Sequence, residues 1–181
     1  MELSALLARL AGEEQSELMK APVARLLAAL PPSAPSDWRQ LAACLAVLES
    51  ERIAADDGRV CRVMGISGGQ GAGKSTLADL LVEALGCLGL RAASLSLDDF
   101  YLTRPERVDL GRRVHPLLAT RGVPGTHDVA MACRAIDGIR AGESCVVPVF
   151  DKAADDRRDE DRVIEGPLDL LVFEGWCLGA Q

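Results

Sequence analysis

The stretch VCRVMGISGGQGAGKST, residues 60–76, joins a short apolar run to a glycine-rich turn. Within it, Gly68 to Ser75 match the pattern G-x-x-x-x-G-K-[ST] at every specified position. The apolar run 60–66 predicts a strand, and leucines at helical spacing predict a helix over 76–88. A second apolar segment, 91–97, predicts the next strand. Strand, loop, helix and strand in this order predict a βαβ unit and therefore a parallel sheet.

Each residue type in the glycine-rich turn suits the binding of a nucleoside triphosphate. Glycines let backbone N–H groups curl around the phosphates, and the N-terminus of the following helix adds a positive partial charge. Lys74 supplies a mobile cation, and the hydroxyl of Ser75 can bind Mg²⁺. The predicted nucleotide-binding residues are Gly68, Gly69, Gln70, Gly71, Ala72, Gly73, Lys74, Ser75 and Thr76. The strand and helix on either side argue against the alternative, a turn that binds nothing.

Three carboxylates stand where predicted strands end. Asp98 and Asp99 follow the strand 91–97, and Glu174 follows the strand 168–173. Ligands of open parallel sheets bind beyond the carboxyl ends of the strands. Asp98 is therefore the candidate base for an acceptor hydroxyl, and Glu174 is the candidate to hold Mg²⁺ with Ser75. The alternatives are a turn or helix cap for the aspartates and a plain surface position for Glu174.

Composition and charge restrict the classes of partner. The net charge is -7, so the surface should repel a polynucleotide, and no nucleic-acid partner is expected. No apolar run is long enough to cross a bilayer and no signal-peptide pattern is present, which predicts a cytoplasmic protein without a membrane contact. The six cysteines are scattered, so neither zinc nor a disulfide framework is expected. The oligomeric state stays open.

The flanking segments predict two domains, a helical extension over 1–58 and a phosphate-loop domain over 59–181. Helices are expected over 1–30, with breaks near Gly12 and Pro22, and from a Ser36 cap to Asp57-Gly58. The rest predicts a long loop over 101–127, a helix over 129–139, a strand over 144–150 and a solvated, mixed-charge excursion over 151–162.

Two sets of motifs carry a resemblance to known kinases. The phosphate loop together with Ser96-Leu97-Asp98-Asp99-Phe100-Tyr101 resembles the uridine kinase, phosphoribulokinase and pantothenate kinase group. That resemblance implies an α/β P-loop fold of the nucleoside-monophosphate-kinase type, and it puts activation of the acceptor hydroxyl on Asp98. Residues 115–116, 121–128 (RGVPGTHD), 148–152 (PVFDK) and 173–176 (FEGW) resemble the D-glycerate 3-kinase family more closely.

Membership of that family implies ATP-dependent phosphorylation of D-glycerate to 3-phosphoglycerate, an alcohol group as acceptor, and the cofactors ATP and Mg²⁺. The implied catalytic residues are Asp98 and Lys74. The acceptor would contact Asp99, Tyr101, Arg121, His127 and Lys152. Arginine suits a carboxylate-bearing acceptor because it grips carboxylates with two hydrogen bonds. The alternatives are a solvated Arg121, a structural His127 and, around Lys152, Arg157 and Arg158, a salt-bridged surface. The segment 101–113 either closes over the site or is an ordinary flexible loop.

Chains of this family continue past the Glu174-Gly175-Trp176 segment with further strands and a lid. We therefore expect an incomplete sheet with an open edge. Two other functions remain open: a P-loop kinase for pantothenate, a nucleoside or a sugar phosphate, and a nucleotide-binding module without phosphotransfer. A P-loop GTPase is disfavoured because the guanine-specifying N-K-x-D string is absent.

Overall fold

The computed structural model describes residues 3–56 and 60–179 and divides the chain into two compact units. One unit comprises Met1–Ser94 with Leu168–Gln181, and the other comprises Leu95–Pro167. In the described part of the chain, no helix combines the length and the hydropathy that a membrane span needs. The predicted domain boundary after residue 58 lies outside the described residues and stays a prediction.

Three helices begin the first unit: α1 (Leu3–Ala11), α2 (Glu13–Ala29) and α3 (Ser36–Ala55). Gly12, with φ at +84°, separates α1 from α2 as predicted. The predicted break at Pro22 is wrong, because α2 runs through it. Met19, Val23 and Leu26 are buried around the proline, and at ~1.5–3 kcal/mol each their burial outweighs the ~3 kcal/mol that an interior proline costs.

The start of α3 also differs slightly from the prediction. Pro35 occupies the N-cap position, and Ser36 is the first helical residue, without a side-chain cap hydrogen bond. The predicted end of this helix at Asp57-Gly58 lies outside the described residues. Helix α3 ends at Ala55.

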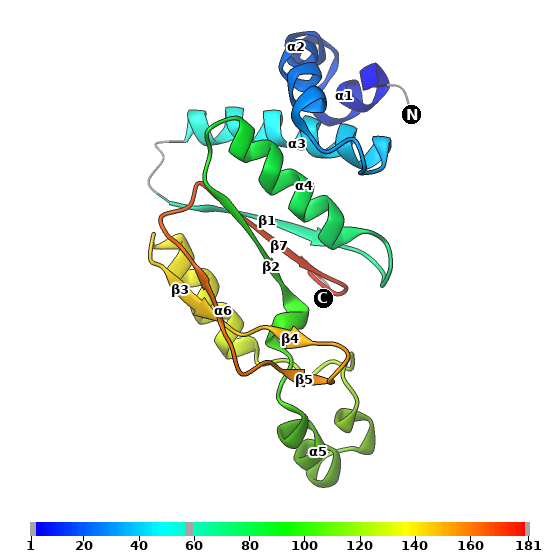
Figure 1. Ribbon diagram of the computed structural model, residues 1–181, viewed down its shortest axis with the longest axis vertical. Helices are drawn as coiled ribbons and strands as arrows, with labels where there is room; N and C mark the ends of the chain where they lie inside the picture. Colours follow the sequence, from blue (N-terminus) through cyan, green and yellow to red (C-terminus); the bar gives the residue numbers. More distant parts are fainter. Residues whose placement is uncertain (1–2, 57–59, 180–181) are drawn as a thin grey trace. The chain divides into compact units, whose positions relative to one another are not determined.

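The sheet of the first unit contains three strands: β1 (Arg62–Ser67), β7 (Leu170–Gly175) and β2 (Ala92–Ser96), in the order β1-β7-β2. β1 and β7 pair in parallel from Arg62↔Leu170 to Ser67↔Gly175. Helix α4 (Lys74–Cys87) lies along one face of the sheet (Figure 1). The predicted parallel α/β arrangement is confirmed. β1 is an edge strand with Val63 42% exposed, as expected for an open sheet.

One hydrophobic core joins the N-terminal helices to the sheet unit. Val23 of α2, Val47 of α3, Leu81 of α4 and Leu170 of β7 are all buried in the same cluster. β7 enters the sheet from the far end of the sequence because Leu170, Leu171 and Val172 are apolar and fully buried. The extension therefore packs directly against α4, the helix that begins at the phosphate loop.

The second unit has short elements: η1 (Leu97–Phe100), α5 (Arg104–Arg113), η2 (Pro116–Ala119), α6 (Val129–Arg140), β3 (Cys145–Val147), β4 (Phe150–Asp151), β5 (Asp156–Arg157) and β6 (Arg162–Ile164). β3 pairs with β6, and β4 pairs with β5, both antiparallel. The predicted strand 144–150 splits because Pro148 has no backbone donor for a ladder.

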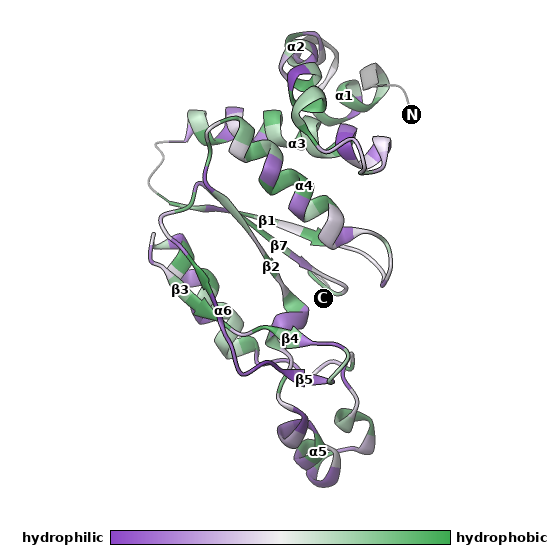
Figure 2. Cartoon of the chain, viewed as in Figure 1, coloured by the Kyte–Doolittle hydropathy of each residue, from purple (hydrophilic) through white to green (hydrophobic). Residues whose placement is uncertain are grey.

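The prediction of a loop over 101–127 is wrong in part, because α5 and η2 lie within it. The backbone N–H of Thr103 donates to Glu106 Oε2 at 2.8 Å, which closes a capping box at the start of α5. Figure 2 shows α5 as mostly hydrophilic. The helix was missed because it has no apolar stripe to read from the sequence.

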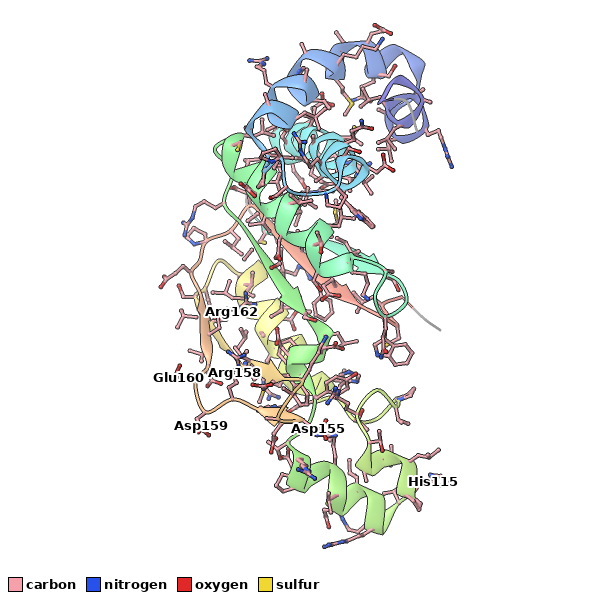
Figure 3. The ribbon with its side chains drawn as sticks, turned by 45° about the vertical axis from the view of Figure 1, so that its right-hand side comes forward. His115, Asp155, Arg158, Asp159, Glu160 and Arg162 are labelled. Atoms are coloured by element: carbon pink, nitrogen blue, oxygen red, sulfur yellow. The ribbon has the colours of Figure 1, made fainter. Side chains whose placement is uncertain are left out.

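The mixed-charge run 151–162 is solvated over part of its length. Asp159 and Glu160 are exposed, and Figure 3 shows their side chains pointing away from the ribbon. Arg158 Nε lies 3.7 Å from Asp151 Oδ2, a surface ion pair within the run. Arg157 of β5 differs from these residues, because it is half-buried and its Nη2 atom is shielded from solvent.

Candidate functional site

The phosphate loop combines left-handed glycines with the start of a helix. Gly71 has φ at +72° and Gly73 has φ at +82°, a region that residues with a Cβ atom rarely adopt. Helix α4 begins immediately after Gly73 and has no side-chain cap, so its first N–H groups remain available to an anion. Lys74 Nζ donates to the carbonyl of Gly69 at 3.0 Å, which holds the ammonium over the loop. Gly69 to Ala72 are exposed, so a ligand can reach them.

The two predicted magnesium ligands lie together. Ser75 Oγ donates to Glu174 Oε1 at 2.9 Å, although the two residues are 99 positions apart in the sequence. Glu174 is 7% exposed in β7. A hydroxyl and a carboxylate suit Mg²⁺, which prefers oxygen ligands and takes only one or two from the protein when it binds with a nucleotide. Within the described residues, no group of three or more His, Cys, Asp or Glu side chains offers a separate metal centre.

Trp38 contacts the phosphate loop from the helical extension, a contact that the sequence did not indicate. A Cβ atom at Gly73 would lie 2.9 Å from Cζ2 of the Trp38 ring and 3.2 Å from its Cε2. The indole of α3 therefore packs against the backbone of the glycine that precedes Lys74. No sequence motif announces such a contact, because a tryptophan on an apolar helix face reads as ordinary core.

Replacing Trp38 with alanine should lower MgATP affinity by roughly tenfold, ~1.4 kcal/mol, because Gly73 loses the wall that supports its backbone. Trp38→Phe should retain most of the affinity. Ile53→Ala, which removes packing at the other end of α3, is the matched control. Isothermal titration calorimetry with MgATP measures all three variants. Equal affinities for Trp38→Ala and Ile53→Ala would show that the contact is only structural.

In the second unit, Asp98, the predicted base, forms an ion pair with Lys152, which is predicted to bind the acceptor substrate. Lys152 Nζ lies 2.8 Å from Asp98 Oδ2. Asp98 is in η1, where its backbone N–H donates to Ser96 Oγ, and Lys152 follows β4. The lysine side chain is 64% exposed and that of Asp98 is 26% exposed, so solvent or a ligand can reach the pair. The pair presents a carboxylate and a cation side by side.

Asp99, which the resemblance also assigned to the acceptor site, contacts the protein backbone. Its Oδ1 accepts a hydrogen bond from the N–H of Phe150 at 3.2 Å, which ties η1 to β4. Burial raises the pKa of this carboxyl above its ordinary value, and the hydrogen bond from Phe150 opposes the rise. The contact gives Asp99 a structural task whether or not it also touches a substrate.

Tyr101 and His127 form the aromatic part of the same unit. Their rings stack with centroids 4.1 Å apart, and the Phe150 and Tyr101 rings meet edge to face with centroids 5.1 Å apart. His127 Nε2 is buried without a hydrogen-bond partner in the described part of the chain. Burial lowers the pKa of His127 from its ordinary 6.5, and the charge of Asp98 opposes this shift. The stacked imidazole is thus biased toward its neutral form.

The lowered pKa of His127 predicts a pH-dependent stability. The unfolded chain binds a proton near pH 6.5 more readily than the folded chain does, so the free energy of unfolding should fall as the pH drops below 6.5. One proton limits the slope to about 1.4 kcal/mol per pH unit. Urea unfolding between pH 7.5 and 5.5 should show a smaller slope for His127→Gln than for His115→Gln, which changes the other, exposed histidine. Identical slopes would contradict the prediction.

Arg121 is already paired. Its Nη1 lies 2.6 Å from Asp155 Oδ1, and its guanidinium stands 5.8 Å from the centre of the Phe150 ring. Asp155 also pairs with Arg107 at 3.2 Å. Burial acts to raise the pKa of Asp155, but the hydrogen bonds and charges of Arg121 and Arg107 together outweigh it and lower that pKa. Arg107 is fully buried and donates to the carbonyls of Leu102 and Asp155. Sequence reasoning missed this arginine because nothing in a charged helix marks which side chain turns inward.

Comparisons with known proteins find relatives but no matching family model. An uncharacterized kinase of Schizosaccharomyces pombe is 38% identical over 130 residues, 66% of this chain and 47% of that protein. D-glycerate 3-kinase of Arabidopsis thaliana is 35% identical over 130 residues, 65% of this chain and 28% of that protein. The solved structure of D-glycerate 3-kinase from Cryptococcus neoformans superposes with a TM-score of 0.66 at 31% identity, over 81% of this chain and 54% of that one.

The relatives include both groups of kinases that the sequence motifs resemble. Uridine kinases are also related, among them that of Halobacterium salinarum at 30% identity over 112 residues. The chain spans about half of the length of these relatives, or less. By sequence and by fold, it is a homologue of the P-loop kinases that include D-glycerate 3-kinase and the uridine kinases.

Proposed function

We propose that this protein transfers the γ-phosphoryl group of ATP to a hydroxyl of a small acid, and that the acid is D-glycerate. The observation that carries the proposal is the 2.9 Å hydrogen bond between Ser75 of the phosphate loop and Glu174. It brings two oxygen ligands of the kind that Mg²⁺ requires to the start of a helix suited to phosphate. Two relatives named D-glycerate 3-kinase support the choice of acceptor.

The residues of the first unit would hold the nucleotide. The loop amides from Gly68 to Ser75 and the Lys74 ammonium would bind the phosphates. Ser75 and Glu174 would hold Mg²⁺, which neutralises charge on the phosphate oxygens when it is bound. Trp38 supports the loop through Gly73.

The residues of the second unit would handle the acceptor. The acceptor oxygen forms a bond to the γ-phosphorus as the bond from that phosphorus to the β–γ bridging oxygen breaks, and ADP leaves. Asp98 takes the hydroxyl proton. Lys152, 2.8 Å from Asp98, offers a cation to the acceptor's carboxylate beside the reacting hydroxyl. Arg121 and His127 would also bind the acceptor. We further propose that the protein is cytoplasmic.

A panel of acceptors in a coupled ADP-release assay tests the proposal. With MgATP, D-glycerate should stimulate ADP release, and L-glycerate, pantothenate, uridine and ribulose 5-phosphate should not. The product should show the ³¹P signal of 3-phosphoglycerate. If uridine alone stimulated ADP release, D-glycerate would be rejected as the acceptor in favour of a nucleoside, since uridine kinases are also relatives. ATP binding without release in the presence of any acceptor would support a binding module instead of a kinase.

A further inference from the structure

A pocket on the second unit is lined by none of the residues assigned above to nucleotide and acceptor. It has a volume of about 440 Å³. Its lining includes Met131 and Arg134 of α6, Val146 of β3, Pro148 directly after that strand, Arg157 of β5, and Asp161. We call it the arginine pocket. Small-molecule sites in proteins have volumes of about 300–1,000 Å³, so this open hollow has room for a metabolite.

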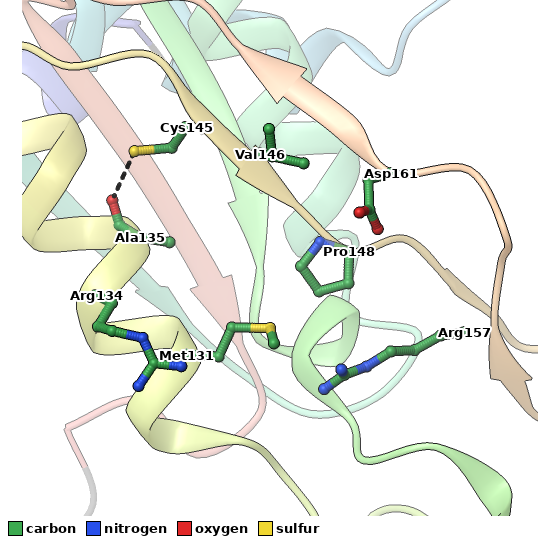
Figure 4. A pocket seen from close by; sticks show the side chains of 8 residues that line it. All are labelled: Met131, Arg134, Ala135, Cys145, Val146, Pro148, Arg157 and Asp161. Carbon is green, nitrogen blue, oxygen red and sulfur yellow. Dashed lines mark hydrogen bonds between the residues drawn. The ribbon is translucent and has the colours of Figure 1, made fainter.

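The charges of the arginine pocket favour an anion. Arg134 and Arg157 bring two guanidinium groups, and Asp161 brings one carboxylate, in a chain whose net charge is -7. Figure 4 shows the two guanidinium groups on either side of Met131. Within the described residues, Arg134 forms no ion pair. Guanidinium groups bind carboxylate or phosphate oxygens through paired hydrogen bonds, so this arrangement suits either group.

An unsatisfied donor strengthens the case for a ligand. Nη2 of Arg157 is buried and has no hydrogen-bond partner in the part of the chain that the structure describes. A buried donor of this kind costs free energy unless a partner reaches it. An anionic oxygen in the pocket would supply that partner. Apart from Asp161, the other lining residues are apolar, which suits a ligand with a carbon skeleton.

We propose that the arginine pocket binds a small organic anion, carrying a carboxylate or a phosphoryl group, between Arg134 and Arg157. The ligand would influence the acceptor residues through Arg157. Nε of Arg157 donates to the carbonyl of Tyr101 at 2.8 Å, and the Tyr101 ring stacks on His127. An anion that draws the guanidinium into the pocket therefore changes how Tyr101 is held, and occupancy of one place alters affinity at the other. The coupling rests on the proposed function, whereas binding at the pocket does not.

Methyl-labelled methionine tests the binding directly. The chain has four methionines, and Met131 lines the pocket, so its ¹³C-methyl signal reports occupancy. Succinate and inorganic phosphate are titrated separately, without nucleotide or acceptor. At least one of these two probes should shift the Met131 signal saturably. A response to succinate alone identifies a carboxylate ligand, and a response to phosphate alone identifies a phosphorylated one. No saturable response to either probe would overturn the proposal.

Two variants separate the pocket from general electrostatics. Arg134→Gln should weaken the responding probe by roughly fivefold or more, because one of the two guanidinium groups is lost. Arg134 is exposed on α6, so the substitution leaves the core intact. Arg140→Gln removes the same charge from an exposed position of the same helix that does not line the pocket, and it should bind like the unmodified protein. Equal weakening in both variants would reject a specific site.

The ring signals of the two histidines test the coupling. At a probe concentration near the dissociation constant of the unmodified protein, the His127 signal should shift in that protein and should shift clearly less in Arg134→Gln. His115, exposed at the N-cap position before η2, is the internal control. If the probe shifted the Met131 signal and left the His127 signal unchanged, the coupling would be overturned. Because these titrations contain no ATP, they can fail while the acceptor panel succeeds, and the reverse also holds.

Discussion

Replacing Lys74 with alanine should abolish detectable phosphotransfer, a loss of roughly 10²–10³ or more in turnover, as expected when a preorganised charge-stabilising group is removed. Lys74 opens α4, and its Nζ is held at 3.0 Å from the Gly69 carbonyl, in the middle of the loop. Without this ammonium, the negative charge on the transferring phosphoryl group has no mobile cation from the protein. The affinity for MgATP should fall as well, because the loop amides then act alone.

The control for this substitution is Lys20→Ala. Lys20 is one of only three lysines in the chain, and it makes an exposed pair with Glu17 on α2. Both variants should unfold at the same temperature as the unmodified protein within a few degrees, because neither side chain is in the core. ADP release and calorimetry with MgATP give the comparison. Normal turnover in Lys74→Ala would remove the phosphate-loop assignment, on which the whole proposed function depends.

Replacing Asp98 with asparagine should lower kcat by about 10²–10⁴ and change MgATP affinity little, because general-base catalysis acts on the acceptor hydroxyl. Asparagine keeps the size of the side chain and its place in η1. It removes the proton-accepting carboxylate and also leaves Lys152 without its charged partner. A substantial part of the effect should therefore appear in kcat, while the Michaelis constant for D-glycerate also responds to the freed lysine.

Two further variants separate these contributions. Lys152→Met should raise the Michaelis constant for D-glycerate and should lower kcat less than Asp98→Asn does, since a binding cation is lost and the base is kept. Asp109→Asn removes an exposed carboxylate that pairs with Arg113 on α5, and it should not alter either parameter. Initial-rate measurements over a range of D-glycerate concentrations provide the values. A kcat for Asp98→Asn equal to that of Asp109→Asn would exclude Asp98 as the base.

The phosphate loop was predictable because its chemistry is contiguous. The glycines, Lys74 and Ser75 must follow one another, since successive backbone amides have to surround one anion. Local spacing likewise predicted α4, α6 and the three strands of the parallel sheet. The position of Glu174 beside Ser75 could be anticipated only as a meeting of strand ends. The 2.9 Å contact between them depends on β7 lying next to β1.

The failures have a common cause in packing over long sequence distances. Pro22 predicts a break, and three buried apolar side chains around it keep α2 continuous. Helix α5 lacks an apolar stripe, and its start depends on the Thr103–Glu106 capping box. Which arginine of that helix becomes buried, Arg107, is decided by carbonyls at Leu102 and Asp155. Propensity and periodicity contain none of these partners.

Residue order alone was enough to specify the phosphate loop, the helix that follows it, and the carboxylates at the ends of two strands, because each of these depends on neighbours along the chain. Tertiary structure decided which distant groups meet: Trp38 against Gly73, Lys152 beside Asp98, and Arg157 between Tyr101 and the arginine pocket. Such contacts form when apolar surfaces far apart in the sequence are buried together, and a local sequence pattern cannot predict them.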